Sequence, residues 1–521
     1  MRYAFLILIA LVLAVPFVVR RALAPNEGDE FKGSSAERLV VITPHNQDIR
    51  REFARAFGEW HRIHYGRAVA LDLLTPGGTS DIKRQLDSTY RNRSEGHFSA
   101  DISVVWGGGD YFVDQELKPL GILQPIHFTP EMAAEFRRAF PQPALAGVKL
   151  YDATAAPDGT PTPLWIGVCL SSFGICYNPD VYRALGLPDP SPEHGWSNLT
   201  DPKLAGFVAM ADPAHAGSSA VAYQMVIQRK MAEAETLVFA RNPELRELAK
   251  AALSENAEYR AAIAGGWKAG MAELLKIAAN TRYFTDSSTI VPMDVSRGEA
   301  AAGMSIDFYA RVTEESAGPD RIRYFAPVGV TAVTPDPVAI LAGTQGRALE
   351  LANHFIEFLL SPQGQRLWIL KAHTPGGPID RSLRRMPIRH DLYADQTDWA
   401  DHGDPLLTAG GFNQRGAWMT LFSDTRPIWV AAWIDGRDAL RDAYAAILAV
   451  HDPARRRRLI DRLADIPIEM SDVGDLRAER KRLEESHGDL DLWRANEQIE
   501  WAKTFRRHYR RVQREAQANE G

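Results

Sequence analysis

The sequence predicts an α/β protein built from two lobes. With 521 residues, the chain is too long for a single hydrophobic core, so more than one domain is expected. Along two successive stretches, short apolar runs alternate with amphipathic segments, which is the pattern of strands and helices in a doubly wound sheet. Apolar residues make up 45% of the chain and charged residues 24%, as in ordinary soluble domains. The net charge of -6 argues against nucleic acid as a partner, because nucleic-acid binding needs a basic surface.

The chain begins with an apolar segment that is expected to direct export. Residues 3–19 contain no charged side chain, and arginines stand on both sides of them. Their number falls between the core of a signal peptide and a full membrane-spanning helix. We therefore interpret residues 1–24 as a signal peptide or a membrane anchor, and we favour the anchor. The polar residues 25–36 would form a tether.

The first lobe is predicted to open with three strands over residues 38–43, 69–74 and 102–106, which are short apolar runs. Apolar side chains recur at helical spacing over residues 48–64, and a second helix is expected over residues 81–90. In such sheets, ligands bind beyond the carboxyl ends of the strands. The turns expected at that edge are residues 43–46, 77–80 and 107–110.

The second lobe is predicted from a later series of strands and helices. A turn at residues 211–213 ends one strand, and the loop at residues 217–219 opens the helix that follows. A strongly amphipathic helix is expected over residues 347–360. The extended segments of this part are residues 164–170, 174–177, 207–210, 303–306, 324–333 and 337–341.

These elements divide the chain into parts. Lobe 1 is predicted to comprise residues 37–165 and 326–400, lobe 2 residues 166–325, and a helical C-terminal extension residues 401–521. The two cysteines, Cys169 and Cys176, would stand roughly 23 Å apart on one continuous strand. A disulfide cannot reach that far, so two buried thiols are predicted, unless a hairpin brings the cysteines together.

A series of short motifs follows in order between residues 38 and 378. They are Ala100-Asp101 with Trp106-Gly107-Gly108, Gly121-Ile122-Leu123-Gln124-Pro125, residues 196–202, Ala211-Asp212-Pro213 with Gly217-Ser218-Ser219, Gly298-Glu299-Ala300-Ala301, Ile306-Asp307-Phe308-Tyr309, and residues 359–365. In this order they resemble the extracellular solute-binding proteins of ABC importers. The resemblance is to the branch that binds ferric iron, spermidine or putrescine, thiamine and phosphonates.

The resemblance implies a periplasmic-binding-protein fold of the second type, whose two lobes are joined by crossover strands and close on a solute. It also implies a periplasmic location, permease subunits of the transporter as partners, no catalytic activity and no cofactor. Contact with the membrane would come through the N-terminal helix. Ferric-binding relatives carry adjacent tyrosines where this chain has Asp307-Phe308-Tyr309, and this departure argues against direct iron coordination. The C-terminal extension has no counterpart in the family.

The solute is predicted to be an anion or a zwitterion. The loops at residues 77–80 and 217–219 precede helices, whose N-termini attract anions, although plain helix capping by their hydroxyl groups would explain the same residues. Asp110 and Asp307 would instead suit an amine, or a metal held together with His45 and Tyr309. A zwitterion such as an aminophosphonate satisfies both sets. The predicted ligand-binding residues are Thr43, His45, Asn46, Gly78, Thr79, Ser80, Trp106, Gly108, Asp110, Ser218, Ser219, Asp307 and Tyr309.

Three functions follow from these observations. The first is capture of a small anionic or zwitterionic solute, or of ferric ion with an anion, for an ABC importer. The second is a membrane-anchored sensor or docking subunit that uses the same fold. The third is an exported hydrolase, which the sequence disfavours because it contains no nucleophile elbow and no Cys-x-x-Cys pair. No metal site is predicted.

Overall fold

The computed structural model describes residues 37–91, 101–139, 142–156, 159, 161–402, 418, 421–486 and 489–518. The predicted signal or anchor and the tether lie outside these ranges. Among the helices within them, none combines the length and the apolar character needed to cross a membrane.

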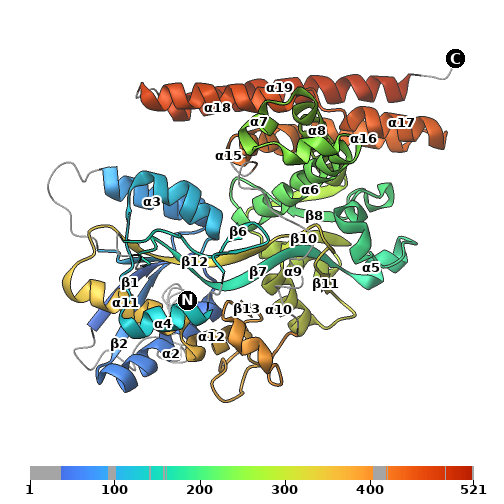
Figure 1. Cartoon of the computed structure of the whole chain (residues 1–521). Coiled ribbons are helices and arrows are strands. Elements are labelled where there is room, and N and C mark those ends of the chain that lie inside the picture. The colour runs from blue at the N-terminus through green and yellow to red at the C-terminus, as the bar shows by residue number, and fades with distance from the viewer. Residues whose placement is uncertain are drawn as a thin grey trace, which may run out of the picture.

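One curled sheet runs through the described part of the molecule (Figure 1). Its strands follow the order β2-β1-β3-β12-β7-β10-β8-β9. Their bounds are β1 (Glu37–Ile42), β2 (Val69–Leu74), β3 (Val104–Trp106), β7 (Ile166–Tyr177), β8 (Val208–Ala211), β9 (Thr281–Thr285), β10 (Ala302–Ile306) and β12 (Val333–Leu341). We call the elements packed on β1, β2 and β3 the first half of the molecule, and those packed on β8, β9 and β10 the second half.

In the first half, β1 runs parallel to both β2 and β3. The apolar stripe that predicted a helix over residues 48–64 forms helix α2 (Gln47–Tyr65), because its aromatic side chains have partners to pack against. Phe53 of α2 lies 4.3 Å from the ring of Trp368, and Phe57 lies 5.1 Å from that of Phe355. Phe355 belongs to α11 (Gly346–Leu360), and Trp368 to α12 (Pro362–Ile369). These helices form the core that holds the carboxyl end of β1 in place.

The two halves are joined by the long central strands β7 and β12, which pair antiparallel to each other. Both strands are buried along nearly their whole length, because the rest of the sheet and its helices surround them. Most of their residues are apolar. The two extended segments predicted at residues 164–170 and 174–177 are a single strand, so no hairpin joins the cysteines. Cys169 and Cys176 are both buried and free, as predicted.

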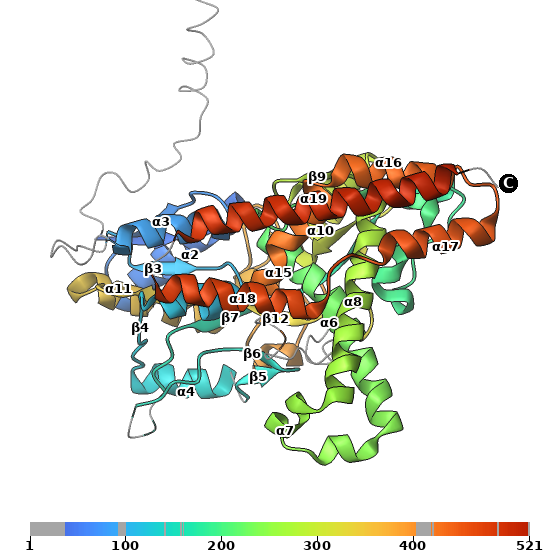
Figure 2. The same ribbon diagram turned by 90° about the horizontal axis from the view of Figure 1, so that it is seen from above.

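In the second half, the sheet continues with β10 antiparallel to β7 and parallel to β8, which in turn pairs with β9. Two long helices, α6 (Gly217–Arg241) and α8 (Ala257–Ala279), pack closely together and project from the body of the molecule (Figure 2). The segment at residues 324–333, predicted as one strand, contains only the short strand β11 (Arg323–Phe325) before β12 begins at Val333.

The C-terminal extension is helical, as predicted, and it packs on the second half. Its helices are α15 (Phe422–Trp429), α16 (Arg437–Leu448), α17 (Pro453–Ala464), α18 (Met470–Glu485) and α19 (Leu490–Gln517). Trp429, Phe505 and Tyr509 join the same hydrophobic core as Tyr223 of α6 and Trp267 of α8. In the view from above, α18 and α19 reach across toward α3 (Thr79–Arg91) of the first half (Figure 2).

Candidate functional site

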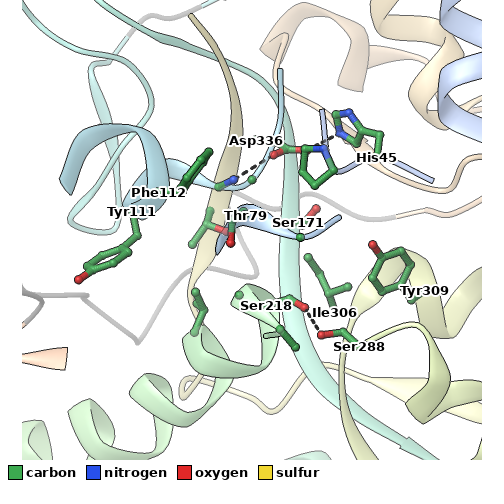
Figure 3. Close-up of a pocket in the computed structure, with 18 of the residues that line it drawn as sticks. His45, Thr79, Tyr111, Phe112, Ser171, Ser218, Ser288, Ile306, Tyr309 and Asp336 are labelled. Carbon is green, nitrogen blue, oxygen red and sulfur yellow. Dashed lines mark hydrogen bonds and ion pairs between the residues drawn. The ribbon is translucent and has the colours of Figure 1, made fainter. Parts of the chain in front are cut away.

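A cavity of about 560 Å³ lies between the two halves, beside the central strands (Figure 3). Loops that follow β1, β2 and β3 form one side, and loops of the second half form the other. The carboxyl ends of the strands therefore converge on one space, as the sequence predicted. The lining includes residues 44–46, 77–79, 108–112, 215–218, 286–289 and 334–336, together with Ser171, Phe308, Tyr309, Arg385 and Arg426.

Helix N-termini surround this cavity. Helices α2, α3, α6, α9 (Ile290–Arg297) and α10 (Asp307–Ala317) all begin beside it. Asn46 caps α2 by accepting a hydrogen bond from the backbone N–H of Ile49 at 3.0 Å. In the described structure, α6 and α9 have no side-chain cap. The first N–H of α9, that of Ile290, donates to the Ser287 carbonyl at 3.2 Å, so α6 has the more open N-terminus. Together these helix ends favour an anion, because each carries partial positive charge.

Hydroxyl groups connect two of these helix ends in the second half. Ser218 Oγ donates to Ser288 Oγ at 2.7 Å, and Ser219 Oγ lies 3.1 Å from the same atom. Ser218 and Ser288 line the cavity, whereas Ser219 is buried behind them. A cluster of hydroxyls and free backbone N–H groups is suited to the oxygens of a phosphate, sulfate or carboxylate.

The floor of the cavity is a buried ion pair on the first half, in which Asp336 of β12 is the central acceptor (Figure 3). Its Oδ2 accepts from Arg385 Nη1 at 2.6 Å and lies 2.8 Å from His45 Nε2. Its Oδ1 accepts from the backbone N–H of Gly109 at 3.1 Å. Arg385 also donates to Ser171 Oγ from Nη2 at 2.8 Å. The donors and acceptors of the floor thus satisfy one another.

The glycines after β3 allow this arrangement because they keep space beside the floor. Gly107 and Gly108 both have φ +98°, a conformation that residues with a side chain rarely adopt. A Cβ on Gly107 would lie 2.8 Å from the His45 ring, and one on Gly108 2.7 Å from Phe112. The turn therefore lets the backbone approach His45 closely and donate to Asp336.

Electrostatics fix the charges of the floor. Burial alone would raise the pKa of Asp336, but the Arg385 guanidinium and His45 hold that pKa well below its usual range. Burial lowers the pKa of His45 despite the neighbouring carboxylate, so its imidazole is neutral near pH 7. His45 Nε2 then donates to Asp336, and His45 Nδ1 accepts from the Thr43 hydroxyl at 2.8 Å. The charge of Arg385 is paired directly with the Asp336 carboxylate.

Two further cavity groups are uncharged or partly charged at neutral pH. Burial raises the pKa of Asp110 to about 7. Burial also raises the pKa of Tyr309 to about 12, so its phenol stays protonated. Both groups can therefore donate a hydrogen bond to a ligand oxygen, Asp110 only in its protonated form.

Most of the predicted ligand-binding residues line the cavity, and five do not. Thr43 orients His45, and Trp106 is fully buried 5.1 Å from Phe53. Ser80 Oγ donates to the backbone carbonyl of Ala214 across the two halves at 3.1 Å. Ser219 and Asp307 are also buried, and Asp307 accepts from the backbone N–H of Ser172 at 2.7 Å. Those that line the cavity are His45, Asn46, Gly78, Thr79, Gly108, Asp110, Ser218 and Tyr309.

Sequence reasoning missed the residues that come from distant parts of the chain. Asp336 stands between two prolines, where the strand register shifts, and that Pro-Asp-Pro run was the available signal. Arg385 lies in a segment without regular structure, and Arg426 lies in the extension. Neither arginine belongs to a motif, so no local pattern could have identified it.

Comparison with known proteins shows which family part of the chain resembles. Residues 168–371 match the model of the family described as bacterial extracellular solute-binding protein. The matched residues are less than half of the chain, and over them the chain is similar to the bacterial extracellular solute-binding proteins. The resemblance predicted from its motifs is thereby confirmed. The chain also shares its fold with the periplasmic binding protein AfuA from Actinobacillus pleuropneumoniae, solved with fructose-6-phosphate bound. That likeness covers 77% of this chain and 98% of AfuA, with 19% identity and a TM-score of 0.50.

The curated relatives match only part of this chain. The phosphoglycerate transport regulatory protein PgtC of Salmonella typhimurium is 26% identical over 214 residues, which cover 41% of this chain and 43% of PgtC. The chain thus spans less than half the length of this relative. A Haemophilus influenzae protein described as uncharacterized is 22% identical over 330 residues, covering 63% of this chain and 75% of that protein.

Proposed function

We propose that this protein captures a small phosphorylated organic anion in the periplasm and delivers it to the permease subunits of an ABC importer. The observation that carries the proposal is the ring of helix N-termini around the cavity, joined by the hydroxyl groups of Ser218 and Ser288. Backbone N–H groups and hydroxyls in this arrangement are typical of phosphate recognition.

The relatives support a phosphorylated solute. AfuA is described with fructose-6-phosphate bound, and PgtC is named for phosphoglycerate transport. Both compounds combine a phosphate group with a small hydroxylated carbon skeleton. In this chain, Asn46, Tyr309 and protonated Asp110 would supply hydrogen bonds to such a skeleton, while the helix ends of α6 and α9 hold the phosphate.

Capture would follow closure of two lobes about the central strands. In this proposal, the first half would serve as lobe 1 and the second half as lobe 2, with the paired strands β7 and β12 as crossover strands. A ligand that touches both halves stabilises the closed arrangement, because it adds contacts that the open one lacks. The hydrogen bond from Ser80 to the Ala214 carbonyl already joins the two halves without a ligand.

Calorimetric titration of the purified protein tests this function. The panel is fructose 6-phosphate, 3-phosphoglycerate, glycerol 3-phosphate, inorganic phosphate, fructose and spermidine. We expect one organic phosphate to bind and to raise the melting temperature, since saturation at 100 times Kd stabilises the folded state by about 2.7 kcal/mol. Binding of spermidine without any phosphate compound would contradict the proposal.

The second candidate, a sensor or docking subunit, is favoured by one observation. PgtC is named a regulatory protein, and the present chain has a helical extension that packs on the second half. A sensor would bind the same solute and pass the closed state to a partner protein. Co-purification of a signalling protein, rather than permease subunits, from cells that contain the solute would distinguish it from the importer component. The proposed N-terminal anchor would serve either function.

A further inference from the structure

The C-terminal extension forms part of the mouth of the cavity. Trp429 of its helix α15 stands edge-on to Tyr223 of α6, with ring centroids 5.7 Å apart, and its Nε1 donates to Met271 Sδ of α8 at 3.2 Å. From the other side, Asp424 of α15 accepts from Arg480 Nε of α18 at 2.8 Å. Helix α15 is therefore fixed to the half of the molecule that carries the N-terminus of α6.

Arg426 reaches from α15 into the cavity. Its side chain lines both the cavity and a neighbouring groove between α3 and the extension. Only 21% of the side chain is exposed, and its buried Nε has no hydrogen-bond partner among the residues that the structure describes. Its Nη1 lies 3.9 Å from Glu116 Oε1, which is longer than a hydrogen bond. The guanidinium thus keeps uncommitted donors beside the ligand space.

Arg385 also lines the cavity, but its environment differs from that of Arg426. Asp336 and Ser171 take up its donors, and its charge is paired with the Asp336 carboxylate. The Phe308 ring lies 4.3 Å from its guanidinium carbon, so an aromatic face covers it. An anion that enters the cavity therefore finds a less strongly paired cation at Arg426 than at Arg385.

Helix α15 also contacts the first half at the cavity mouth. Ser423 hydrogen-bonds the Tyr111 hydroxyl, and Glu116 carries the carboxylate next to Arg426. Glu116 is shared with Lys83 of α3, whose Nζ lies 3.4 Å from its Oε2. Glu116 would keep this second cationic partner if Arg426 turned to a ligand.

We propose that Arg426 is a ligand-binding residue, which holds the anionic group of the solute from the mouth and exchanges its loose contact with Glu116 for the ligand. The planar guanidinium can donate two parallel hydrogen bonds to phosphate or carboxylate oxygens. The C-terminal extension thus completes the solute site and closes over it. This inference rests on the proposed function, because it assumes an anionic solute.

The test compares four full-length proteins by titration with fructose 6-phosphate, 3-phosphoglycerate, glycerol 3-phosphate and inorganic phosphate. They are the wild type, Arg426→Gln, Arg426→Lys and the control Arg441→Gln, whose side chain is 64% exposed on α16. Removing the guanidinium is expected to weaken binding of the preferred organic phosphate about 10- to 100-fold, since hydrogen bonds to charged groups carry most of such a contact. Lysine should restore part of the affinity, and the control should bind like the wild type.

A further variant, Glu116→Gln, tests the exchange independently if the Arg426 variants misfold. It removes the carboxylate that competes with the ligand for Arg426, so its affinity is expected to equal or exceed that of the wild type. An organic phosphate that binds wild type and Arg426→Gln equally would overturn the role of Arg426 and leave the proposed function intact. Weaker binding by Glu116→Gln than by the wild type would also count against the exchange. If none of these anions binds the wild type, the proposed function fails and this inference fails with it.

Discussion

The two sides of the cavity are built on opposite principles. On the first half, Asp336, His45 and Arg385 form a buried polar floor whose donors and acceptors are satisfied within the protein. On the second half, Ser218 and Ser288 stand beside the N-termini of α6 and α9, which have no side-chain cap in the described structure. The floor is complete without a ligand and therefore stabilises the fold. The side formed by Ser218, Ser288 and their helix ends, which we call the rim, has open donors that can exchange water for a solute.

From this difference we predict which residues of the cavity stabilise the fold and which would bind a solute. Changes in the floor should alter the free energy of unfolding more than ligand affinity, because they leave a buried charge without a partner. Changes in the rim should do the reverse. Asp110 and the C-terminal extension are intermediate cases, since each belongs to the cavity wall and to the packed interior.

The largest effect is expected from removal of the extension. A chain that ends at residue 402 loses the packing of Trp429, Phe505 and Tyr509, and exposes the apolar faces of Tyr223 and Trp267. We expect this chain to aggregate or to lose cooperative unfolding, as measured by gel filtration and urea denaturation. A soluble truncated chain with the wild-type unfolding midpoint would show that the extension is an independent module. The single substitution Arg426→Gln is therefore the better test of the extension's role in binding.

The next largest effect should come from Asp336→Asn, which leaves the Arg385 charge unpaired in the floor. Breaking such a buried pair is expected to lower the free energy of unfolding by about 3–5 kcal/mol, measured by urea denaturation. The matched control is Asp286→Asn, an exposed aspartate of the cavity lining, which should change stability by no more than about 0.5 kcal/mol. Equal effects of the two substitutions would remove the distinction between floor and rim.

Asp110 should make stability depend on pH. Burial raises its pKa to about 7, so the unfolded chain loses this proton at lower pH than the folded one. The contribution of Asp110 to stability is therefore greatest below about pH 4 and declines as the pH rises to about 7. Asp110→Asn should exceed the wild type in stability by about 1–2 kcal/mol at pH 8 and lose this advantage near pH 4, in urea titrations of both proteins. A difference that is constant with pH would show that Asp110 does not titrate in this range.

The smallest effect is expected at the rim. Ser218→Ala removes one hydroxyl, which should weaken binding of the preferred organic phosphate about 3- to 10-fold, by the usual energy of a neutral hydrogen bond. Its free energy of unfolding should stay within about 0.5 kcal/mol of the wild type. Ser296→Ala, an exposed hydroxyl on α9 that donates to the Met293 carbonyl, is the control for affinity. A larger loss of stability than of affinity would place Ser218 with the structural residues.

Much of the fold follows from local sequence patterns. The apolar runs at residues 38–43 and 69–74 became β1 and β2, and the stripe over residues 48–64 became α2, because strand and helix periodicities are short-range properties. The loops after these strands also line the cavity, since parallel strands place their carboxyl ends at one edge. The resemblance to extracellular solute-binding proteins could likewise be inferred from the order of the motifs.

The missing part of the site depends on contacts between residues far apart in the chain. Asp336 and His45 are 291 positions apart, and no periodicity relates them. Trp106 and Asp307 were predicted to bind ligand because Trp106 ends a strand and Asp307 follows one. Both are buried in the interior, which the strand pattern does not reveal. Their roles depend on which side chains the other elements bring against them.

By itself, the sequence determined the strands, the helices, the glycine turn at residues 107–109 and the resemblance to solute-binding proteins. Only the tertiary structure decided that Asp336 and Arg385 form the floor and that Arg426 of the extension reaches the cavity. The physical reason is that local propensity acts over a few residues, whereas pairing of β12 with β3 and packing of α15 on α6 depend on the whole folded chain.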